Sequence, residues 1–283
     1  QNRLADNMSR LYSGATNKIV VSPSASINNL AQRTVMVWMN LTAFGGAGGA
    51  GVWCSRGTDP GVASSFSVDD GTDGSPHEAR IDAGTDSLSD SSSSQVVLGT
   101  WTHVAATYDN TGTRKANIFV NGVEVSSYTT QIAATGLLAD DSGTNLEVGH
   151  LNTDGSFTTH GSLYDFRLYD SILTPTEIAA IVAGGITTDP QPTHNKCQLT
   201  FASDAGATEP DASGNSNTGV ITGATFSSSS PFVYNVPDCR TFGQFPNTAV
   251  TVQATNFYTV PAHPSHSNPT DSRVSRIIPV DSR

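Results

Sequence analysis

Short apolar stretches separated by turn residues recur along the chain, and their pattern predicts β-strands. In residues 34–41, TVMVWMNL, apolar side chains such as Val37 and Trp38 occupy both sets of alternating positions. A strand with two apolar faces is expected where protein covers both of them. We therefore predict that residues 34–41 form a strand between two layers.

The dipeptide Asn121-Gly122 lies between two apolar stretches, ANIFV and VEVSSY. Both residues accept the positive φ angles of a two-residue turn, so this segment predicts a β-hairpin. Further short strands are predicted at residues 18–21, 52–57, 64–70, 78–84, 100–108, 146–150, 163–170, 197–202 and 219–226.

One helix is predicted among these strands. Thr174 is suited to the N-cap, Pro175 to the first helical position, and Glu177 completes a capping box. Gly184 and Gly185 end the segment. Because the other segments predict strands or turns, the expected fold class is all-β, as a sandwich of two antiparallel sheets.

The composition argues against two classes of partner. Charged residues are 14% of the chain, the formal net charge is −11, and three lysines occur, Lys18, Lys115 and Lys196. Nucleic acid binding requires cations that displace counterions from phosphates, so no nucleic acid partner is expected. No apolar stretch approaches the roughly 18 residues that span a bilayer, so no membrane insertion is expected.

Residues 235–283 differ in composition from the rest of the chain. Seven of the fourteen prolines lie between residues 231 and 283, where short apolar pieces alternate with Pro and Ser. We predict an extended, Pro-rich C-terminal arm here rather than a second core. Such an arm is suited to docking by addition of a strand to the sheet edge of a partner.

Several motifs, taken in order, resemble one family. They are TVMVWMNL (34–41), GTWTHVAATYDNTG (99–112), ANIFVNGVEV (116–125), LEVGH (146–150) and GSLYDFRLYDSILTPTEIAAI (161–181). Together they resemble the concanavalin A-like, laminin-G-like jelly roll, with its W-x-H-V-A strand, its F-V-N-G turn and its D-x-R-[IL]-Y strand before a short helix. The resemblance covers residues 10–184 and implies a jelly-roll β-sandwich.

The segment DASGNSNTGVITGATF (211–226) resembles a D-S-S-G-N-G-N-x-G-T-V-x-G-A segment that members of this family carry, normally near the start of the domain. Here it follows the helix. The resemblance implies a permuted jelly roll over residues 1–234, with a main body at 10–184 and closing strands at 196–234. A second, truncated domain is the alternative, and it would have too few strands to bury a core.

In similar jelly rolls this Asp-containing turn helps to hold a structural calcium ion, together with acids of the D-x-R strand. The resemblance therefore implies a calcium site at Asp211, Asn215 and Asp165. Tyr164 stands where one of the expected acids would be. Solvated acidic turns are the alternative interpretation, both here and for the acidic loop VDDGTDG at 68–74.

The three cysteines, Cys54, Cys197 and Cys239, have neither zinc nor redox spacing. They are interpreted as small buried hydrophobic residues, or Cys197 and Cys239 as a disulfide that leaves Cys54 free. The odd number argues against a scaffold built on disulfides.

No catalytic constellation is recognisable, so we do not predict an enzyme. Glycosidases need two opposed carboxylates, and the nearest approach is Glu209-Pro-Asp211, where the proline is unsuited to a strand. His103 falls in the W-x-H-V pattern, and a hydrogen-bonded core histidine is favoured over a lyase base. Trp53 follows a glycine-rich loop and is either a sugar-stacking residue or a half-buried packing residue.

Two functions are compatible with these features. A jelly roll with a permuted segment and a proline-rich extension resembles virion proteins of tailed phages. This resemblance implies a non-catalytic capsid decoration or tail protein at the virion surface. Its partners would be other virion proteins, or copies of itself in a homo-oligomer or repeating assembly. The alternative is an extracellular carbohydrate-binding or adhesion module of a secreted protein, and binding to surface glycans is compatible with both.

Overall fold

A computed structural model gives the structure of the chain at residues 8–13, 16–43, 51–56, 65–69, 78–82, 88–91, 95–135, 140–150, 158–202 and 206–232. At 51–53, 65–69, 78–82 and 88–91 it describes the backbone alone. The arm predicted at 235–283 and most of the acidic loop at 68–74 lie outside these residues. All the described residues belong to one unit, Gln1–Asn235.

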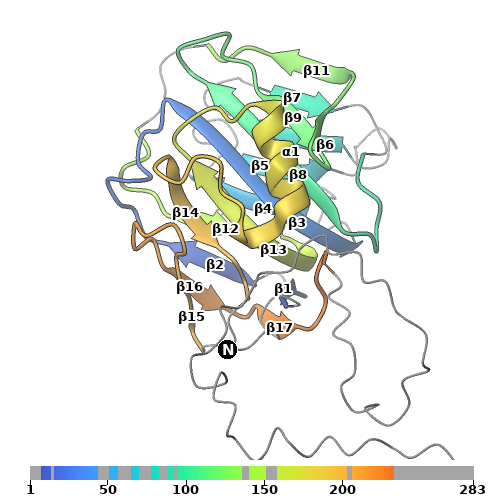
Figure 1. Cartoon of the computed structure of the whole chain (residues 1–283), viewed down its shortest axis with the longest axis vertical. Coiled ribbons are helices and arrows are strands. Elements are labelled where there is room, and N and C mark those ends of the chain that lie inside the picture. Colours follow the sequence, from blue (N-terminus) through green and yellow to red (C-terminus); the bar gives the residue numbers. More distant parts are fainter. Residues whose placement is uncertain are drawn as a thin grey trace, which may run out of the picture. The chain divides into compact units, whose positions relative to one another are not determined.

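Two antiparallel sheets make up most of the described chain (Figure 1). The first, sheet A, has the strand order β10-β9-β8-β3-β13-β1-β17, and β14 pairs with one part of β13. Its strands are β1 (Ser9–Tyr12), β3 (Gln32–Ala43), β8 (Thr102–Asp109), β9 (Asn117–Val120), β10 (Val123–Glu124), β13 (His160–Tyr169), β14 (Asn195–Leu199) and β17 (Thr225–Ser227).

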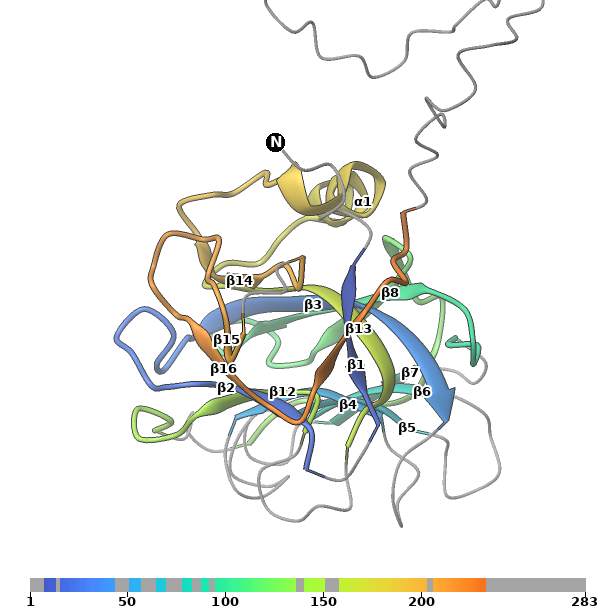
Figure 2. The same ribbon diagram turned by 90° about the horizontal axis from the view of Figure 1, so that it is seen from below.

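The second, sheet B, has the strand order β11-β7-β6-β5-β4-β12-β2-β16-β15. Its strands are β2 (Lys18–Val21), β4 (Gly51–Arg56), β5 (Ser65–Asp69), β6 (Glu78–Asp82), β7 (Leu88–Ser91), β11 (Tyr128–Ile132), β12 (Leu146–Val148), β15 (Thr208–Glu209) and β16 (Gly219–Thr222). Figure 2 shows the sheets stacked as two layers, with helix α1 (Pro175–Gly184) on the side of sheet A that faces away from sheet B. The predicted all-β sandwich with one short helix is confirmed.

Strand β3 is buried on both faces, as its sequence predicts. Val37 belongs to the main core between the sheets, together with Val148 of β12. Met36 lies on the opposite face, in a smaller cluster with Ile178 and Ile181 of helix α1. The helix therefore forms a third layer over the central strand, which explains why β3 is apolar at successive positions.

Two local predictions from the sequence are also confirmed. Thr174 Oγ1 accepts a hydrogen bond from the Glu177 N–H at 3.3 Å, and Glu177 Oε2 accepts one from the Thr174 N–H at 2.7 Å, which is the capping box. Gly185 ends the helix with a φ of 68° and begins the short 3-10 helix η2 (Gly185–Thr187). Asn121 and Gly122 have φ angles of 50° and 83° in the turn between β9 and β10.

Strand β13 contains a bulge at Asp165. The register of β13 against β3 shifts between Tyr164 and Arg167, and Asp165 has a positive φ of 51°. Leu163 and Phe166 both belong to the core between the sheets, although three positions separate them. One extra residue is thus accommodated without reversing the inward and outward faces of the strand. The segment before the bulge pairs with β1, and the segment after it pairs with β14.

The segment after the helix adds strands to both sheets. The β15–β16 hairpin joins β2 at the edge of sheet B, whereas β17 pairs with β1 at the edge of sheet A. The sequence predicts one strand over residues 219–226, and this prediction is wrong. Gly223, with a φ of 68°, interrupts it, and the chain passes there from one sheet to the other.

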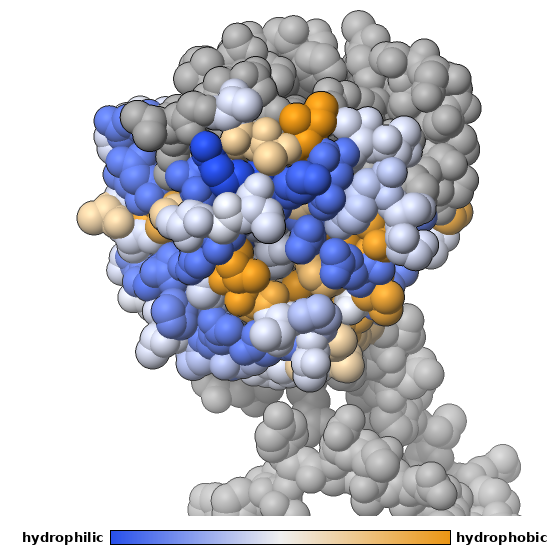
Figure 3. Space-filling view, turned by 90° about the horizontal axis from the view of Figure 1, so that it is seen from above, coloured by the Kyte–Doolittle hydropathy of each residue, from blue (hydrophilic) through white to orange (hydrophobic). Residues whose placement is uncertain are grey.

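The described surface is mixed in polarity. On the face shown in Figure 3, hydrophobic residues gather in separate small groups among hydrophilic ones. Exposed large apolar side chains lie on different elements, for example Val123 on β10 and Val220 on β16. Within the described ranges, no helix has the length and apolar content that crossing a bilayer requires.

Candidate functional site

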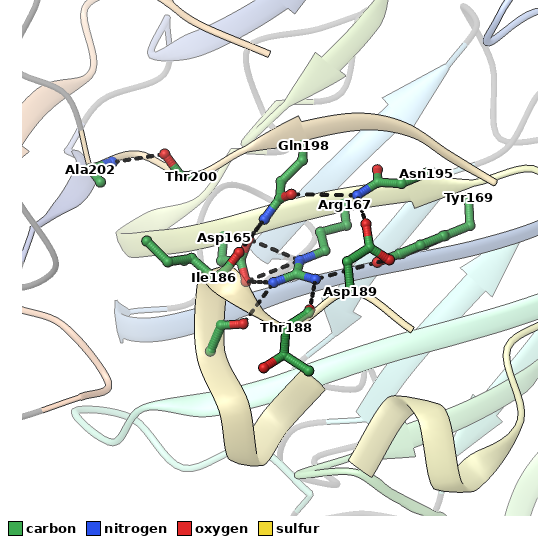
Figure 4. Close-up of polar contacts among 11 residues, drawn as sticks. Asp165, Arg167, Tyr169, Ile186, Thr188, Asp189, Asn195, Gln198, Thr200 and Ala202 are labelled. Atoms are coloured by element: carbon green, nitrogen blue, oxygen red, sulfur yellow. Dashed lines mark hydrogen bonds and ion pairs between the residues drawn. The ribbon is translucent and has the colours of Figure 1, made fainter. Parts of the chain in front are cut away.

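A buried arginine organises the outer face of sheet A, beside the end of helix α1 (Figure 4). Arg167 of β13 is 0% exposed. Its Nε donates to Asp165 Oδ1 at 3.0 Å, and its Nη2 donates to Asp165 Oδ2 at 2.6 Å. Further donors reach the Tyr169 hydroxyl at 3.3 Å and the carbonyl oxygens of Gly185 and Thr188 at 3.0 and 2.5 Å. Gly185 and Thr188 follow helix α1 directly, so these hydrogen bonds from Arg167 link the chain at the end of the helix to the sheet.

The Arg167 network consists of Asp165, Arg167, Tyr169, Asp189, Asn195 and Gln198. Gln198 Nε2 donates to Asp165 Oδ1 at 2.9 Å, and Asn195 Nδ2 donates to Asp189 Oδ2 at 2.8 Å. Burial by itself lowers the pKa of Arg167, but the Asp165 carboxylate outweighs this effect and raises the pKa above its ordinary value. Arg167 is therefore charged, and hydrogen bonds satisfy it and Asp165 on several sides.

Asp211, the first residue of the DASGNSNTG turn, has both carboxylate oxygens occupied by nearby protein groups. Oδ1 accepts the backbone N–H groups of Gln198 and Ser213, each at 2.9 Å. Oδ2 accepts the Ser213 hydroxyl at 2.9 Å and the Asn217 N–H at 2.8 Å. An isolated bridge also pairs Asp211 with Leu199 at the end of β14. This turn is thus anchored to the sandwich by its first side chain.

The three residues predicted to hold calcium all lie around β14. Asp165 contacts the side chain of Gln198, Asp211 contacts the backbone of Gln198, and Asn215 Nδ2 donates to the Asn195 carbonyl oxygen at 2.8 Å. Each one contacts protein groups of this strand. Within the described part of the chain, no group of three His, Cys, Asp or Glu side chains is arranged to hold a metal ion. The calcium site stays a prediction.

The other predicted site residue, Trp53, lies on β4, but its side chain is outside the described residues. Cys54, the next residue, is a buried free thiol, and so is Cys197. Both therefore act as small buried hydrophobic residues, one of the two interpretations from the sequence. Cys239 lies outside the described residues.

His103 is buried on the outer face of sheet A, as a core histidine is expected to be. Its ring centroid lies 5.2 Å from that of Trp38 in an edge-on arrangement, and Phe232 packs on the same tryptophan at 5.5 Å. The Nδ1 atom of His103 has no hydrogen-bond partner in the described chain, so the predicted hydrogen bond is not seen at this atom. Burial, with the charge of Arg167, lowers the pKa of His103 to about 3.

Trp101 differs from the interpretation of its sequence. It precedes β8 instead of lying within it, and its side chain is half-buried. Its Nε1 donates to Ser229 Oγ at 3.1 Å, and its ring lies 6.5 Å from that of Tyr164. The strand predicted at residues 100–108 therefore begins only after Trp101, and the chain that follows β17 contacts this side chain.

Glu209, the glutamate considered for glycosidase chemistry, is an ion-pair partner between the sheets. Its carboxylate is 0% exposed, and Oε2 accepts hydrogen bonds from Arg10 Nε at 3.2 Å and Nη2 at 3.0 Å. Arg10 lies on β1 and Glu209 on β15, so the pair joins sheet A to sheet B. Burial raises the pKa of Glu209, and the hydrogen bonds from Arg10 oppose this.

The sequence reasoning missed a third group of charged residues at one end of the sandwich. Arg56 pairs with Asp141 at 3.3 Å, and Arg33 lies beside them with 5% of its surface exposed. A signal for Arg33 was present in the sequence. It has the same parity as Val35 and Val37, so a regular strand directs it between the sheets.

Comparison with known proteins places this architecture in a family. The family model described as the Concanavalin A-like lectin/glucanases superfamily matches residues 13–179. Among curated protein sequences, none matches the chain significantly.

Solved structures share the fold at low sequence identity. One is a protein from Bacteroides ovatus to which carbohydrate binding has been assigned by inference. It is 19% identical to this chain and aligns with a TM-score of 0.61 over 79% of this chain. The chain spans 60% of the length of that protein. A SAP-like pentraxin from Limulus polyphemus is 16% identical, with a TM-score of 0.47 over 65% of this chain and 86% of its own.

The carbohydrate-binding module CBM40 of the Ruminococcus gnavus IT-sialidase, solved with α2,3-sialyllactose, is 14% identical. It aligns with a TM-score of 0.43 over 60% of this chain and 97% of its own. At these identities the likeness is one of fold alone. The match over residues 13–179 covers more than half of the sequence. The chain therefore belongs to the concanavalin A-like lectin/glucanases superfamily.

Proposed function

We propose that the chain is a non-catalytic carbohydrate-binding module. The observation that carries this proposal is the state of its buried carboxylates. Four carboxylates are buried in the described part of the chain, and each is paired with a cation. The pairs are Arg10 with Glu209, Lys18 with Glu147, Arg56 with Asp141, and Arg167 with Asp165.

Glycoside hydrolysis needs a different arrangement. One carboxylic acid must carry a proton to the leaving oxygen, and a second carboxylate must face the sugar or a water molecule. Burial by itself raises the pKa of Glu147, but hydrogen bonds from His150 and Lys18 hold it below its ordinary value. Glu209 has a raised pKa, as a general acid requires, but it is enclosed between the sheets and held by Arg10. These pairings favour the lectin side of the family over the glucanase side.

The outer face of sheet B is the sugar-binding surface that we propose. Lys18 on β2 is 27% exposed, and its Nζ contacts Glu147 Oε1 at 2.9 Å. Glu147 pairs in register with Ser55 of β4, the strand that also carries Trp53. Cations donate hydrogen bonds to sugar hydroxyls, and aromatic rings offer an apolar face to a sugar ring. The likeness of fold to the Bacteroides ovatus protein supports this proposal.

A glycan array probed with three proteins tests the proposal. We expect the unmodified chain to bind, the Trp53→Ala variant to bind at least about tenfold more weakly, and Trp101→Ala to bind like the unmodified chain. Trp101 is a matched control because it lies directly before β8 of sheet A, where its Nε1 contacts Ser229. Equal loss in both variants, or binding to no glycan, contradicts the proposed surface. New reducing ends released from a bound glycan contradict the non-catalytic role.

A finer proposal concerns where the module works. An extracellular location suits a carbohydrate-binding protein, and a virion surface is the more specific prediction. There, other virion proteins or copies of the chain would be partners of residues 235–283. Mass spectrometry of purified particles tests the virion hypothesis, which is wrong if the chain is absent from them. Mass measurement in solution tests self-association.

A further inference from the structure

The guanidinium of Arg33 lies between the two sheets with part of its hydrogen-bonding capacity unused. The residue is on β3 and 5% exposed. Its Nε and Nη2 atoms are buried, and neither has a hydrogen-bond partner in the described chain. One face of the guanidinium lies over the ring of Tyr108, with Cζ 4.9 Å from the ring centroid. A ring face attracts the cation but accepts no ordinary N–H hydrogen bond in the plane of the guanidinium.

A cavity of about 20 Å³ adjoins Arg33. Apolar side chains, including Ile27, Leu30 and Leu146, line much of it, and Arg56 and Asp141 lie on its polar side. A single water molecule requires roughly 10–15 Å³ measured in this way. The cavity therefore has room for one occupant of about the size of a water molecule or a chloride ion.

Asp141 is near enough for its charge to oppose the lowering of the Arg33 pKa by burial, but no protein group in the described chain accepts a hydrogen bond from Arg33 Nε or Nη2. Asp141 is committed elsewhere, because its Oδ1 accepts the Asn29 N–H at 2.7 Å and its Oδ2 pairs with Arg56 at 3.3 Å. Burial raises the pKa of the Cys54 thiol, so this side chain is neutral. The Tyr108 hydroxyl donates to Asn110 Oδ1 at 3.1 Å.

The charges around the cavity are therefore unbalanced. Two guanidiniums, Arg33 and Arg56, are accompanied by one carboxylate, Asp141. A charge removed from water without a partner is costly, and burial lowers the pKa of Arg33 for this reason. A water molecule would accept one N–H but would leave the charge uncompensated. A small anion would do both.

We infer that the cavity between the sheets binds one small monovalent anion of about chloride size, with Arg33 Nε and Nη2 as its donors. This site is separate from the proposed sugar-binding surface, because it lies on the inner side of β3 whereas that surface is the outer side of sheet B. The anion neutralises the end of the core where Arg33 and Arg56 meet. It acts as a structural ion that stabilises the folded chain.

Crystals of the full chain grown in bromide provide the direct test. Bromide resembles chloride and scatters anomalously, so we expect one anomalous peak within hydrogen-bonding reach of Arg33 Nε and Nη2. This measurement needs no variant and does not depend on whether a substituted chain folds. A cavity that holds water only, without an anomalous peak, overturns the inference.

Thermal unfolding at constant ionic strength provides the second test, with chloride replaced stepwise by gluconate, which is too large for the cavity. Above the dissociation constant, the Tm of the unmodified chain should rise by about 3–5 °C for each tenfold increase in chloride. Arg33→Met should abolish this dependence. Lys196→Met, which removes a cation paired with Asp170 at the surface, should retain it. The same chloride dependence in Arg33→Met and in the unmodified chain contradicts the inference.

Discussion

Arg167 and Arg33 are both buried arginines of sheet A, but they differ in their hydrogen-bond partners. Arg167 faces outward beneath the end of helix α1 and reaches a carboxylate, a hydroxyl and two carbonyl oxygens. Arg33 faces inward and has a tyrosine ring on one side and two N–H groups without a protein acceptor in the described chain. Burial alone therefore does not reveal what a buried arginine does. If protein oxygens lie within hydrogen-bonding distance, the arginine stabilises the fold. If they do not, its N–H groups are available to a ligand.

The two environments differ because their neighbouring backbones differ. Helix α1 ends at Gly184, and the carbonyl oxygens of Gly185 and Thr188, just beyond it, accept hydrogen bonds from Arg167. The bulge at Asp165 adds a carboxylate on the same face. Between the sheets, by contrast, strand backbones pair with one another and leave mainly apolar side chains around Arg33. Arg33 thus has no protein oxygen to accept from its Nε and Nη2 atoms in the described chain.

The largest effect is expected for Arg167→Met. It leaves the buried Asp165 carboxylate without its cation and frees the two carbonyl groups at the helix end. We expect a loss of about 3–5 kcal/mol in the free energy of unfolding, measured by urea denaturation. Adding Asp165→Asn should recover part of this loss, because the uncompensated charge is then removed. A loss below about 1 kcal/mol would mean that the protein partners of Arg167 contribute little to stability, which would contradict the difference from Arg33.

A smaller loss is expected for Asp211→Ala. The substitution removes the acceptor of four hydrogen bonds, three of them from backbone N–H groups. We expect a loss of about 2 kcal/mol in the free energy of unfolding, since freed donors near the surface regain water. Asn215→Ala is the matched control in the same turn and should cost less.

Titration with CaCl₂ in a calorimeter checks the calcium prediction. If calcium binds at this turn, the unmodified chain should give a heat of binding, and Asp211→Ala should give none.

The pH dependence of stability separates the two regions further, because burial, together with the charge of Arg167, lowers the pKa of His103. Its pKa is about 3 in the folded chain, against an ordinary value of 6.5. Between pH 3 and pH 6.5, therefore, His103 binds a proton in the unfolded chain but not in the folded chain. The stability that neutral His103 contributes is complete above pH 6.5 and is lost as the pH falls toward 3.

Unfolding by urea between pH 6.5 and 4.5 checks this prediction. The unmodified chain should lose up to about 1.4 kcal/mol per pH unit more than His103→Gln does. His194→Gln is the control, because this histidine is 52% exposed and pairs with Asp170 at the surface. Parallel curves for the unmodified chain and His103→Gln would mean that the histidine is not held neutral.

The smallest effect is expected for Arg33→Met measured in gluconate alone. Without a small anion, the substitution removes a buried charge that shares its one nearby carboxylate, Asp141, with Arg56, and replaces it with an apolar side chain of similar length. We expect the free energy of unfolding to change by less than about 1 kcal/mol in either direction. A loss as large as that of Arg167→Met would show that Arg33 has a strong protein partner after all.

Local features of the fold were predictable from the sequence because neighbouring residues determine them. The capping box at Thr174, the turn at Asn121-Gly122 and the two apolar faces around Val37 each follow from a few adjacent side chains. The division of residues 219–226 between two sheets was not predictable, because it depends on which distant strands have open edges. The bend at Gly223 shows only that the chain can turn there.

The candidate site was predictable only in part. Asp165 and Arg167 are two residues apart, a spacing that places both on one face of a strand, so their pairing was visible in the sequence. The partners of Asp211 and Arg33 were not visible, because they come from other segments. Asp141, for example, meets the Asn29 N–H across 112 residues of chain. Whether a side chain is satisfied depends on such distant contacts, which residue patterns do not specify.

The position of the first two strands has a consequence for synthesis of the protein. β1 lies between β13 and β17, and β2 lies between β12 and β16, so both await partners made much later. Arg10 meets Glu209 across 199 residues, which a ribosome adds in about 10–40 s. During that interval the nascent chain carries two strand segments with unpaired edges. Chaperones that shield such edges during translation would thus be needed most before residue 209 emerges.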